Sequence, residues 1–198
     1  MRFRSYGEWV QRNLRLAILV GSTREGRFGF TVARWFASLV RIRPEFDVDV
    51  IDLADPELPA VLKHTPDPVV DEYRERLDQA DAFVVVTPEY NHGYPAALKQ
   101  AIDLARAEWQ AKPVAFVSYG GMSGGLRAVE QLRQVFAELH AVTVRDCVSF
   151  HNAWPLFDTD GWLHEEIGAD LAAKTMLDRL AWWGRALRVA RESEPYAA

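Results

Sequence analysis

Short apolar runs alternate along this chain with longer segments in which apolar residues recur every three or four positions. Short runs bounded by turn residues are typical of buried strands, and the longer spacing is typical of helices. Strands are predicted at residues 14–20, 46–53, 82–86, 113–118 and 141–144. Helices are predicted from about residue 32 up to Pro44 and at about 69–80, 95–104, 126–139 and 165–191.

Two of these segments carry further information. The run 82–86 contains no polar residue, which predicts a central strand covered on both faces. The last helix is expected to bury one stripe of large side chains. That stripe comprises Leu171, Met176, Leu177, Leu180, Trp183 and Leu187.

Five strands alternating with five helices predict a three-layer α/β/α sandwich with right-handed crossovers. The five-stranded, doubly wound form of this class is the flavodoxin-like fold, a parallel sheet of order 2-1-3-4-5 with its crevice between strands one and three. A chain of 198 residues suffices for one such domain. We therefore expect a single domain over residues 1–198, with residues 1–13 as an N-terminal extension.

Composition narrows the range of partners and locations. With 23 basic and 28 acidic residues the net charge is -5, and no basic patch is evident, which argues against nucleic acid. No stretch reaches the roughly 18 apolar residues of a membrane span, and no secretory signal is evident. The single cysteine, Cys147, excludes an internal disulfide and is expected to be a buried core residue rather than a catalytic thiol. The cytoplasm is the expected location.

The first strand is followed by a polar, glycine-containing loop, Gly21 to Gly29. Its backbone N–H groups precede a helix, and the partial positive charge of a helix N-terminus favours an anionic phosphate. Arg24 and Arg27 could add charge-assisted hydrogen bonds, and Ser22 could add its hydroxyl. The alternative is a polar turn with solvated arginines.

Familiar nucleotide-binding motifs do not match this loop. A triphosphate-binding loop needs Lys followed by Ser or Thr after its last glycine, whereas Arg27 and Phe28 follow Gly26. The dinucleotide fingerprint needs a second glycine two residues beyond Gly21, where Thr23 stands. A phosphate monoester therefore fits the loop best.

Two more loops are expected at the same edge of the sheet. Thr87 to Tyr94 follows the third strand, and its backbone donors, with Asn91 and aromatic side chains, could hold the edge of a planar heterocycle; a capping turn is the alternative. The loop from Ser118 to Gly125 contains four glycines, which permit close backbone approach to a ligand or form a flexible connection. The scattered histidines and the lack of a nucleophile elbow disfavour metal and serine-hydrolase chemistry. The lack of an evident nucleophile and base favours chemistry carried by a cofactor.

Taken together, the three loops resemble the NAD(P)H-dependent FMN reductase family, which includes quinone, azo-dye and chromate reductases. The resemblance runs from about Leu14 to Val144. Its strongest part is Pro88-Glu89-Tyr90-Asn91 with Pro95 and Leu98 to Asp103, which is similar to the family signature P-E-Y-N-x-x-x-P-x-x-L-K-N-A-I-D. The first loop is similar to a branch that carries G-S-T-R-x-G-R-x-G.

The resemblance implies a set of FMN-binding residues at these three loops. Around the phosphate it implies Ser22, Arg24, Arg27 and Gly29, and it counts Phe28 among the cofactor-binding residues. Along the isoalloxazine it implies Pro88, Glu89, Tyr90 and Asn91 on one side and Ser118, Tyr119, Gly120 and Gly121 on the other. No residue is assigned a catalytic role and no metal is implied.

The same resemblance implies a ping-pong oxidoreductase. NADPH or NADH would give hydride to bound FMN and leave before a small-molecule acceptor, such as a quinone, an azo compound, a metal oxyanion or free flavin, enters the same cleft. Family members commonly form homodimers, sometimes homotetramers. The alternatives are a flavodoxin-like electron carrier and a redox sensor that binds FMN without turnover.

Overall fold

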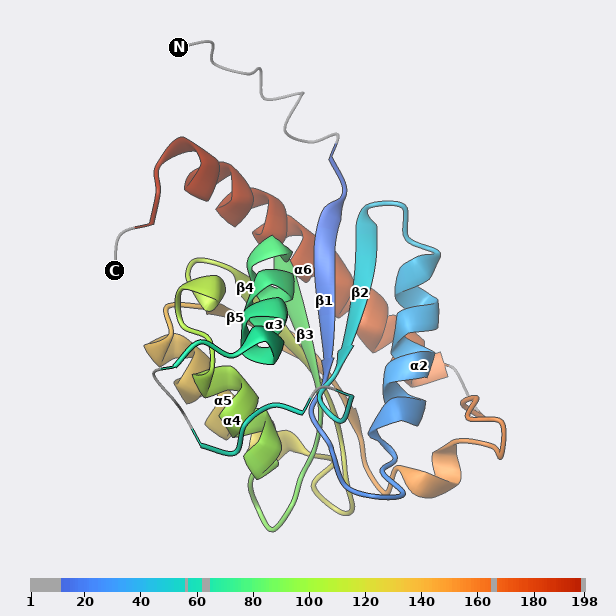
Figure 1. The fold of residues 1–198 in the computed structure, drawn as a ribbon. Helices are drawn as coiled ribbons and strands as arrows, with labels where there is room; N and C mark the ends of the chain where they lie inside the picture. The colour runs from blue at the N-terminus through green and yellow to red at the C-terminus, as the bar shows by residue number, and fades with distance from the viewer. Residues whose placement is uncertain (1–11, 56, 62–64, 165–166, 197–198) are drawn as a thin grey trace.

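A computed structural model describes residues 12–55, 57–61, 65–164 and 167–196, and it confirms the predicted sheet (Figure 1). Five parallel strands pair in the order β2-β1-β3-β4-β5. Their bounds are β1 Leu14–Val20, β2 Phe46–Asp52, β3 Ala82–Pro88, β4 Pro113–Tyr119 and β5 Val142–Phe150. This order places β1 beside β3, so the crevice lies where the sequence pattern predicts it.

Helices cover both faces of this sheet. The α-helices are α2 Gly29–Arg41, α3 Pro68–Gln79, α4 Ala96–Asp103, α5 Leu126–Glu138 and α6 Ile167–Ser193, with short 3₁₀ turns η1 Ala107–Trp109 and η2 Trp154–Leu156. The helices α2 and α6 pack on one face, and α3, α4 and α5 pack on the other (Figure 1). The neighbouring strands β1 and β3 therefore send their chains to opposite sides of the sheet at the crevice.

Burial explains why the middle strands are so apolar. Every residue of β3 and β4 is buried, because alternate side chains enter the two separate cores between sheet and helices. Val84 and Val86 join the core under α2 and α6, whereas Phe83 and Val85 join the core under α3 to α5. Phe83 packs against the fully buried Trp109, with ring centroids 4.6 Å apart.

The fifth strand is longer than predicted. Arg145 and Asp146 interrupt its apolar pattern, but β5 is an edge strand with an irregular register against β4, and Arg145 is 94% exposed. The strand therefore continues through them to Phe150. The prediction for Cys147 was wrong in degree, since its side chain is only partly buried beside the core under α5.

The prediction that α6 buries one stripe of large side chains was also only partly right. Met176, Leu177 and Leu180 are buried, but Leu171 is 66% exposed and Trp183 is 36% exposed. Leu171 lies with Cys147 along a hollow of about 790 Å³ beside the edge strand β5. The predicted start of this helix at Glu165 and residues 1–11 of the predicted extension lie outside the described residues.

The other edge strand, β2, is acidic on one face. Asp47 accepts a hydrogen bond from Asn13, and Asp49 pairs with Arg76 of α3, whose Nη2 lies 2.6 Å from a carboxylate oxygen. Val48 and Val50 point to the opposite face and pack on the core under α2. No helix among the described residues is long and apolar enough to cross a membrane.

A charged cluster fastens the end of α6 to the amino end of the sheet. Asp81 faces Arg188 and Arg191 of α6, at 3.3 and 3.4 Å. Arg191 also donates to the carbonyl of Ala111, next to Lys112. The Lys112 Nζ is buried and donates to the carbonyls of Leu77 and Asp78, at 3.0 and 2.7 Å, which end α3.

The state of Lys112 predicts how stability depends on pH. Burial, assisted by the charge of Arg191, lowers its pKa to about 8. Between that value and the ordinary lysine pKa the unfolded chain binds more protons than the folded one, so stability due to Lys112 rises with pH. The free energy of unfolding of the wild type, minus that of Lys112→Met, should increase by up to about 3 kcal/mol between pH 7.5 and pH 10.5.

Urea unfolding of both proteins across this pH range checks the prediction. The difference between the two free energies of unfolding isolates Lys112 from the other titrating groups. A difference that stays constant with pH would contradict a lowered pKa of Lys112 in the folded protein.

Candidate functional site

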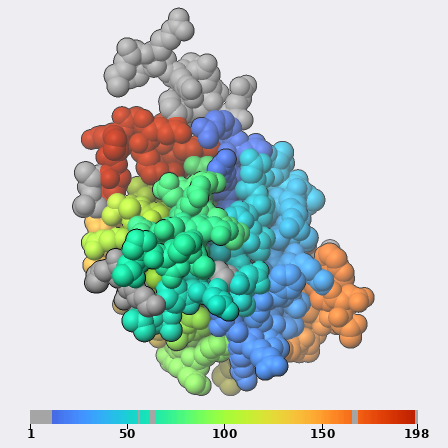
Figure 2. Space-filling view, in the orientation of Figure 1, coloured from blue at the N-terminus to red at the C-terminus, as the bar shows by residue number. Residues whose placement is uncertain are grey.

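The loops that leave the carboxyl ends of the strands enclose a cavity of about 730 Å³. In Figure 2 the blue β1–α2 loop and the green β3–α4 loop project from the lower edge of the molecule, below the sheet of Figure 1. The cavity is lined by Arg24, Glu25, Gly26, Arg27, Phe28, Pro88, Glu89, Tyr90, Asn91, Tyr119, Gly120 and Trp154. This volume lies within the range of about 300–1,000 Å³ that is usual for small-molecule and cofactor sites.

The first loop is held to the end of β2 by an ion pair. Both terminal nitrogens of Arg27 donate to the carboxylate of Asp52, with Nη2 at 2.7 Å, and Nη1 also donates to the carbonyl of Ser22 at 3.1 Å. The hydrogen bonds that Arg27 donates to Asp52 raise the pKa of Arg27. Arg27 therefore shapes the loop and carries a charge that Asp52 largely balances.

Arg24 differs from Arg27 in this respect. Its side chain is exposed, lines the cavity and has no ion-pair partner among the described residues. The backbone around it turns tightly, because Arg27 N–H donates to the Arg24 carbonyl at 3.1 Å and Gly26 has a φ of +64°. Arg24 therefore offers the cavity an uncompensated positive charge.

The second loop makes a two-residue reverse turn at the cavity. Tyr90 and Gly93 exchange backbone hydrogen bonds of 2.8 and 3.1 Å, and Asn91 and His92 between them have φ values of +49° and +74°. Such left-handed conformations are costly for residues other than glycine, with Asn among the more tolerant. The His92 carbonyl is fixed by Gln131 of α5 at 2.8 Å. The turn is thus held with its tip exposed.

Glu89 acts as a brace rather than as a free carboxylate. It accepts hydrogen bonds from the backbone N–H and the guanidinium of Arg127, at 3.2 and 3.1 Å, at the start of α5. Burial raises the pKa of Glu89, but hydrogen bonds from Ser123 and Arg127 outweigh it, so the pKa lies below its ordinary value. Glu89 is therefore an unsuitable proton donor near neutral pH.

The third loop forms the floor of the cavity. Glu89 N–H donates to the Tyr119 carbonyl, and Gly120 N–H donates to the Phe150 carbonyl. The third loop is therefore hydrogen-bonded to the ends of β3 and β5, on both sides of β4. Ser118 is fully buried and donates to the Gly124 carbonyl at 2.8 Å. Gly121 is exposed with open space around it.

Tyr119 places a buried hydroxyl close to the first loop. Its oxygen has no hydrogen-bond partner among the described residues, and a Cβ at Gly29 would lie only 2.8 Å from it. Burial raises the pKa of Tyr119. Ser22 is itself fully buried, and its hydroxyl lies 2.7 Å from the Tyr90 hydroxyl.

Most of the predicted site residues therefore meet at one cavity. Those that line it are Arg24, Arg27, Phe28, Pro88, Glu89, Tyr90, Asn91, Tyr119 and Gly120. Ser22, Gly29 and Ser118 lie behind this lining as buried supports, and Gly121 lies at the outer side of the third loop. Contact of any of these residues with FMN stays a prediction.

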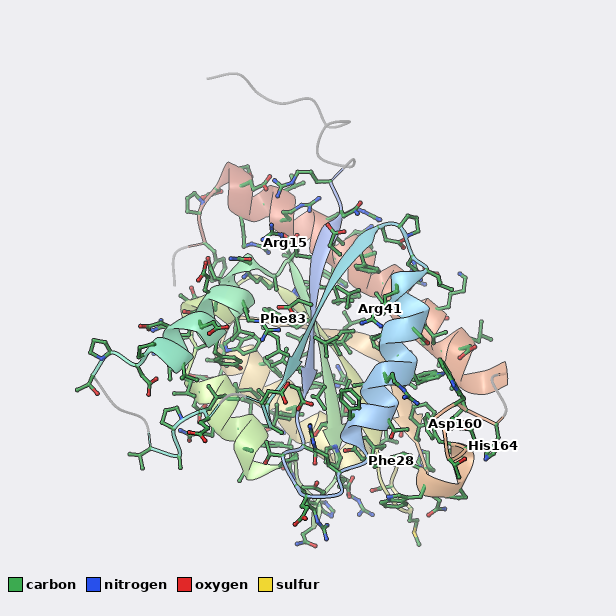
Figure 3. All side chains as sticks on the ribbon, turned by 45° about the vertical axis from the view of Figure 1, so that its right-hand side comes forward. Arg15, Phe28, Arg41, Phe83, Asp160 and His164 are labelled. Carbon is green, nitrogen blue, oxygen red and sulfur yellow. The ribbon has the colours of Figure 1, made fainter. Side chains whose placement is uncertain are left out.

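Sequence reasoning missed Glu25, Gly26 and Trp154 as lining residues. Glu25 and Gly26 lie inside the first predicted loop. Trp154 belongs to a fourth loop, which follows β5 and returns to the first loop: its ring centroid lies 6.3 Å from that of Phe28. Figure 3 shows Phe28 at the start of α2, beside the orange connection that carries Asp160 and His164. Trp154 could have been found from its position after the fifth predicted parallel strand, because the loops that follow such strands lie at the ligand-binding edge of the sheet.

A doubly wound parallel sheet with a polar and aromatic cavity at its switch point defines a nucleotide- or flavin-binding α/β protein. The family model for NADPH-dependent FMN reductase matches residues 14–155. The chain belongs to this family of oxidoreductases, which use FMN and NAD(P)H.

Individual relatives agree with this assignment. The chain is 34% identical over 170 residues to an NAD(P)H:quinone oxidoreductase of Solanum tuberosum, covering 79% of this chain and 86% of the relative. It is 36% identical over 132 residues to an NAD(P)H-dependent FMN reductase of Schizosaccharomyces pombe, covering 61% of this chain and 64% of the relative. The fold is similar to that of the flavoenzyme FerB of Paracoccus denitrificans, with a TM-score of 0.70 and 22% identity over 87% of this chain and 98% of FerB.

The cavity has features that fit FMN. Arg24 supplies a positive charge without a partner for a phosphate, and the Tyr119 hydroxyl is a buried polar group without a partner among the described residues. Phe28 and Tyr90 supply aromatic surface for a planar ring. No cluster of three or more His, Cys, Asp or Glu side chains suited to a metal occurs among the described residues.

The contact between Gly29 and Tyr119 predicts a specific coupling. In Gly29→Ala the new Cβ would meet the Tyr119 oxygen at 2.8 Å, so the variant should lose about 1–3 kcal/mol of unfolding free energy. Adding Tyr119→Phe removes that oxygen and should recover much of the loss. Urea unfolding of the single and double variants measures the coupling.

Gly121→Ala is the matched control, since a Cβ there has nothing within 4 Å. If Gly29→Ala and Gly121→Ala lower the free energy of unfolding equally, the contact with Tyr119 does not exclude a side chain at residue 29. The same holds if the effects of Gly29→Ala and Tyr119→Phe simply add in the double variant.

Proposed function

We propose that this protein is an FMN-dependent NAD(P)H:acceptor oxidoreductase that works by a ping-pong sequence in one cleft. The observation that carries the proposal is the cavity at the switch point, which combines an unpaired arginine with an aromatic wall. Acceptors of the proposed class are quinones, azo compounds, metal oxyanions and free flavin. Quinones are favoured because several relatives are named for them.

The residues that would hold FMN come from all three predicted loops. Arg24 would bind the phosphate, assisted by backbone N–H groups before α2, in a loop that Arg27 shapes through its pair with Asp52. The turn at Asn91 and the backbone at Gly120 would border the flat ring. The chemistry that bound FMN supplies is acceptance of a hydride from NAD(P)H and its return as electrons to an acceptor.

The chain's own contribution is positional. The pair between Arg27 and Asp52 fixes the first loop, and the pair between Glu89 and Arg127 fixes the second, so the cavity walls are set before a ligand enters. The Tyr119 hydroxyl is protonated at neutral pH, and burial raises its pKa further, so it is a hydrogen-bond donor close to the first loop. No side chain has to act as a nucleophile.

A homodimer or homotetramer and a cytoplasmic location also belong to this proposal. Both stay predictions; the first follows from the family resemblance and the second from the sequence features described above. Size-exclusion chromatography with light scattering measures the first directly.

The reductase function is tested by mixing the purified, FMN-loaded protein with NADPH or NADH in the absence of oxygen. We expect the visible absorbance of the oxidised flavin to bleach on the order of milliseconds to seconds in a stopped-flow experiment, as typical turnover numbers imply, and to return when a quinone is added. Retained absorbance with both nucleotides would reject the reductase proposal and leave the electron carrier or sensor.

The phosphate assignment predicts a selective effect of Arg24→Ala. Since Arg24 makes no ion pair within the described chain, its loss should leave the unfolding free energy of the apoprotein within about 0.5 kcal/mol. The loss of one charge-assisted contact should weaken FMN binding by about 1.5–3 kcal/mol, or roughly ten- to hundredfold in Kd.

Fluorescence titration of apoprotein with FMN measures this Kd, and Arg145→Ala, at a 94% exposed position on β5, controls for the change in net charge. Equal FMN affinity in Arg24→Ala and the wild type would show that the phosphate binds elsewhere.

A further inference from the structure

Trp154 is a large aromatic side chain left open to the cavity. It lines the cavity and is 57% exposed, although burial of an indole ring is normally favourable. Phe28 beside it is partly buried, and Tyr119 on the floor is 3% exposed. Exposure therefore increases from the floor to Trp154, which lies at the mouth.

The backbone under Trp154 is fixed to the cavity floor. Ala153 N–H donates to the Gly120 carbonyl at 3.1 Å, and Asn152 N–H donates to the Gly121 carbonyl at 2.9 Å. Trp154 begins η2, whose last residue, Leu156, donates to Ala153 and accepts from His164. The ring is thus carried by a constrained segment.

The packing behind the ring is also aromatic. Phe157 is buried and packs edge-on against Phe28, Trp35 and Phe150, with centroid distances of 5.3, 6.5 and 5.3 Å. Phe28 connects this cluster to Trp154. The indole therefore has firm support on one side and open space on the other.

We propose that Trp154 is the stacking platform for the aromatic electron acceptor, of the quinone class, at the mouth of the cavity. This inference rests on the proposed function. The phosphate and ring-edge partners assigned above lie on the first three loops, whereas Trp154 lies on the fourth. A reactant that enters and leaves during each ping-pong cycle would instead use the exposed surface at the mouth, where the indole ring provides a planar apolar face.

A second tryptophan on the same connection serves as a matched control. Trp162 is 51% exposed, close to the value for Trp154, but it lies against α2 with Arg34 over its ring at 5.6 Å and does not line the cavity. Trp162→Ala therefore removes an equivalent exposed indole from a neighbouring place. Trp154→Phe keeps an aromatic face at the mouth.

Binding is measured first, without turnover. FMN-loaded, oxidised protein is titrated with 2-methyl-1,4-naphthoquinone by equilibrium dialysis in the absence of NAD(P)H. Trp154→Ala should raise the naphthoquinone Kd about five- to tenfold, the equivalent of one aromatic contact. Trp154→Phe should restore most of the affinity, and Trp162→Ala should match the wild type. FMN retention should be the same in all four proteins.

Turnover gives a second readout. Trp154→Ala should raise KM for the naphthoquinone by a similar factor with kcat little changed, but should leave KM for ferricyanide unchanged, since two ferricyanide ions take the two electrons without presenting an aromatic ring. Loss of FMN affinity with unchanged naphthoquinone binding, equal losses in Trp162→Ala, or no effect of Trp154→Ala would overturn the proposal. So would a wild type that binds no naphthoquinone.

Failure of the proposed function has a different signature. In that case the wild type would oxidise NAD(P)H with neither acceptor, whatever the dialysis shows. Trp154-dependent binding without turnover would keep the aromatic platform and reject the reductase.

Discussion

β1 and β3 lie side by side in the sheet, and almost all their residues are buried between two cores. The chain leaves β1 toward α2 on one face and leaves β3 toward α4 on the other. Two loops that diverge from adjacent strand ends cannot fill the space between them, so the packing of the apolar strands itself creates the cavity. The polar residues then decide what the cavity can hold.

Charge pairing converts these loops into fixed walls. Asp52 at the end of β2 holds Arg27, and Arg127 at the start of α5 holds Glu89. In each pair the carboxylate is largely buried, so the removal of one partner would leave the other poorly solvated. These residues support the site, whereas Arg24 and the tip of the turn at Asn91 stay available to a ligand.

Much of this arrangement could be predicted because its signals are local in sequence. Apolar runs ending in glycine or proline gave the strands β1, β3 and β4 and the three loops that follow them. The pairing of Arg27 with Asp52 could not be predicted, since it depends on how two distant loops approach each other. Trp154 was missed for the same reason, and β5 was cut short because an edge strand tolerates Arg145 and Asp146 facing water. The periodicity of α6 did not reveal that Leu171 faces an open hollow beside β5.

The charges on the two outer strands have a consequence for self-association. An open sheet ends in strands whose unpaired backbone groups can recruit another strand, and polar side chains on such edges oppose that addition. Here β2 carries the charged residues Asp47 and Asp49, and β5 carries Arg145 and Asp146 at the irregular part of its register. A sheet with so apolar a centre is thereby protected at both open sides against growth into aggregates.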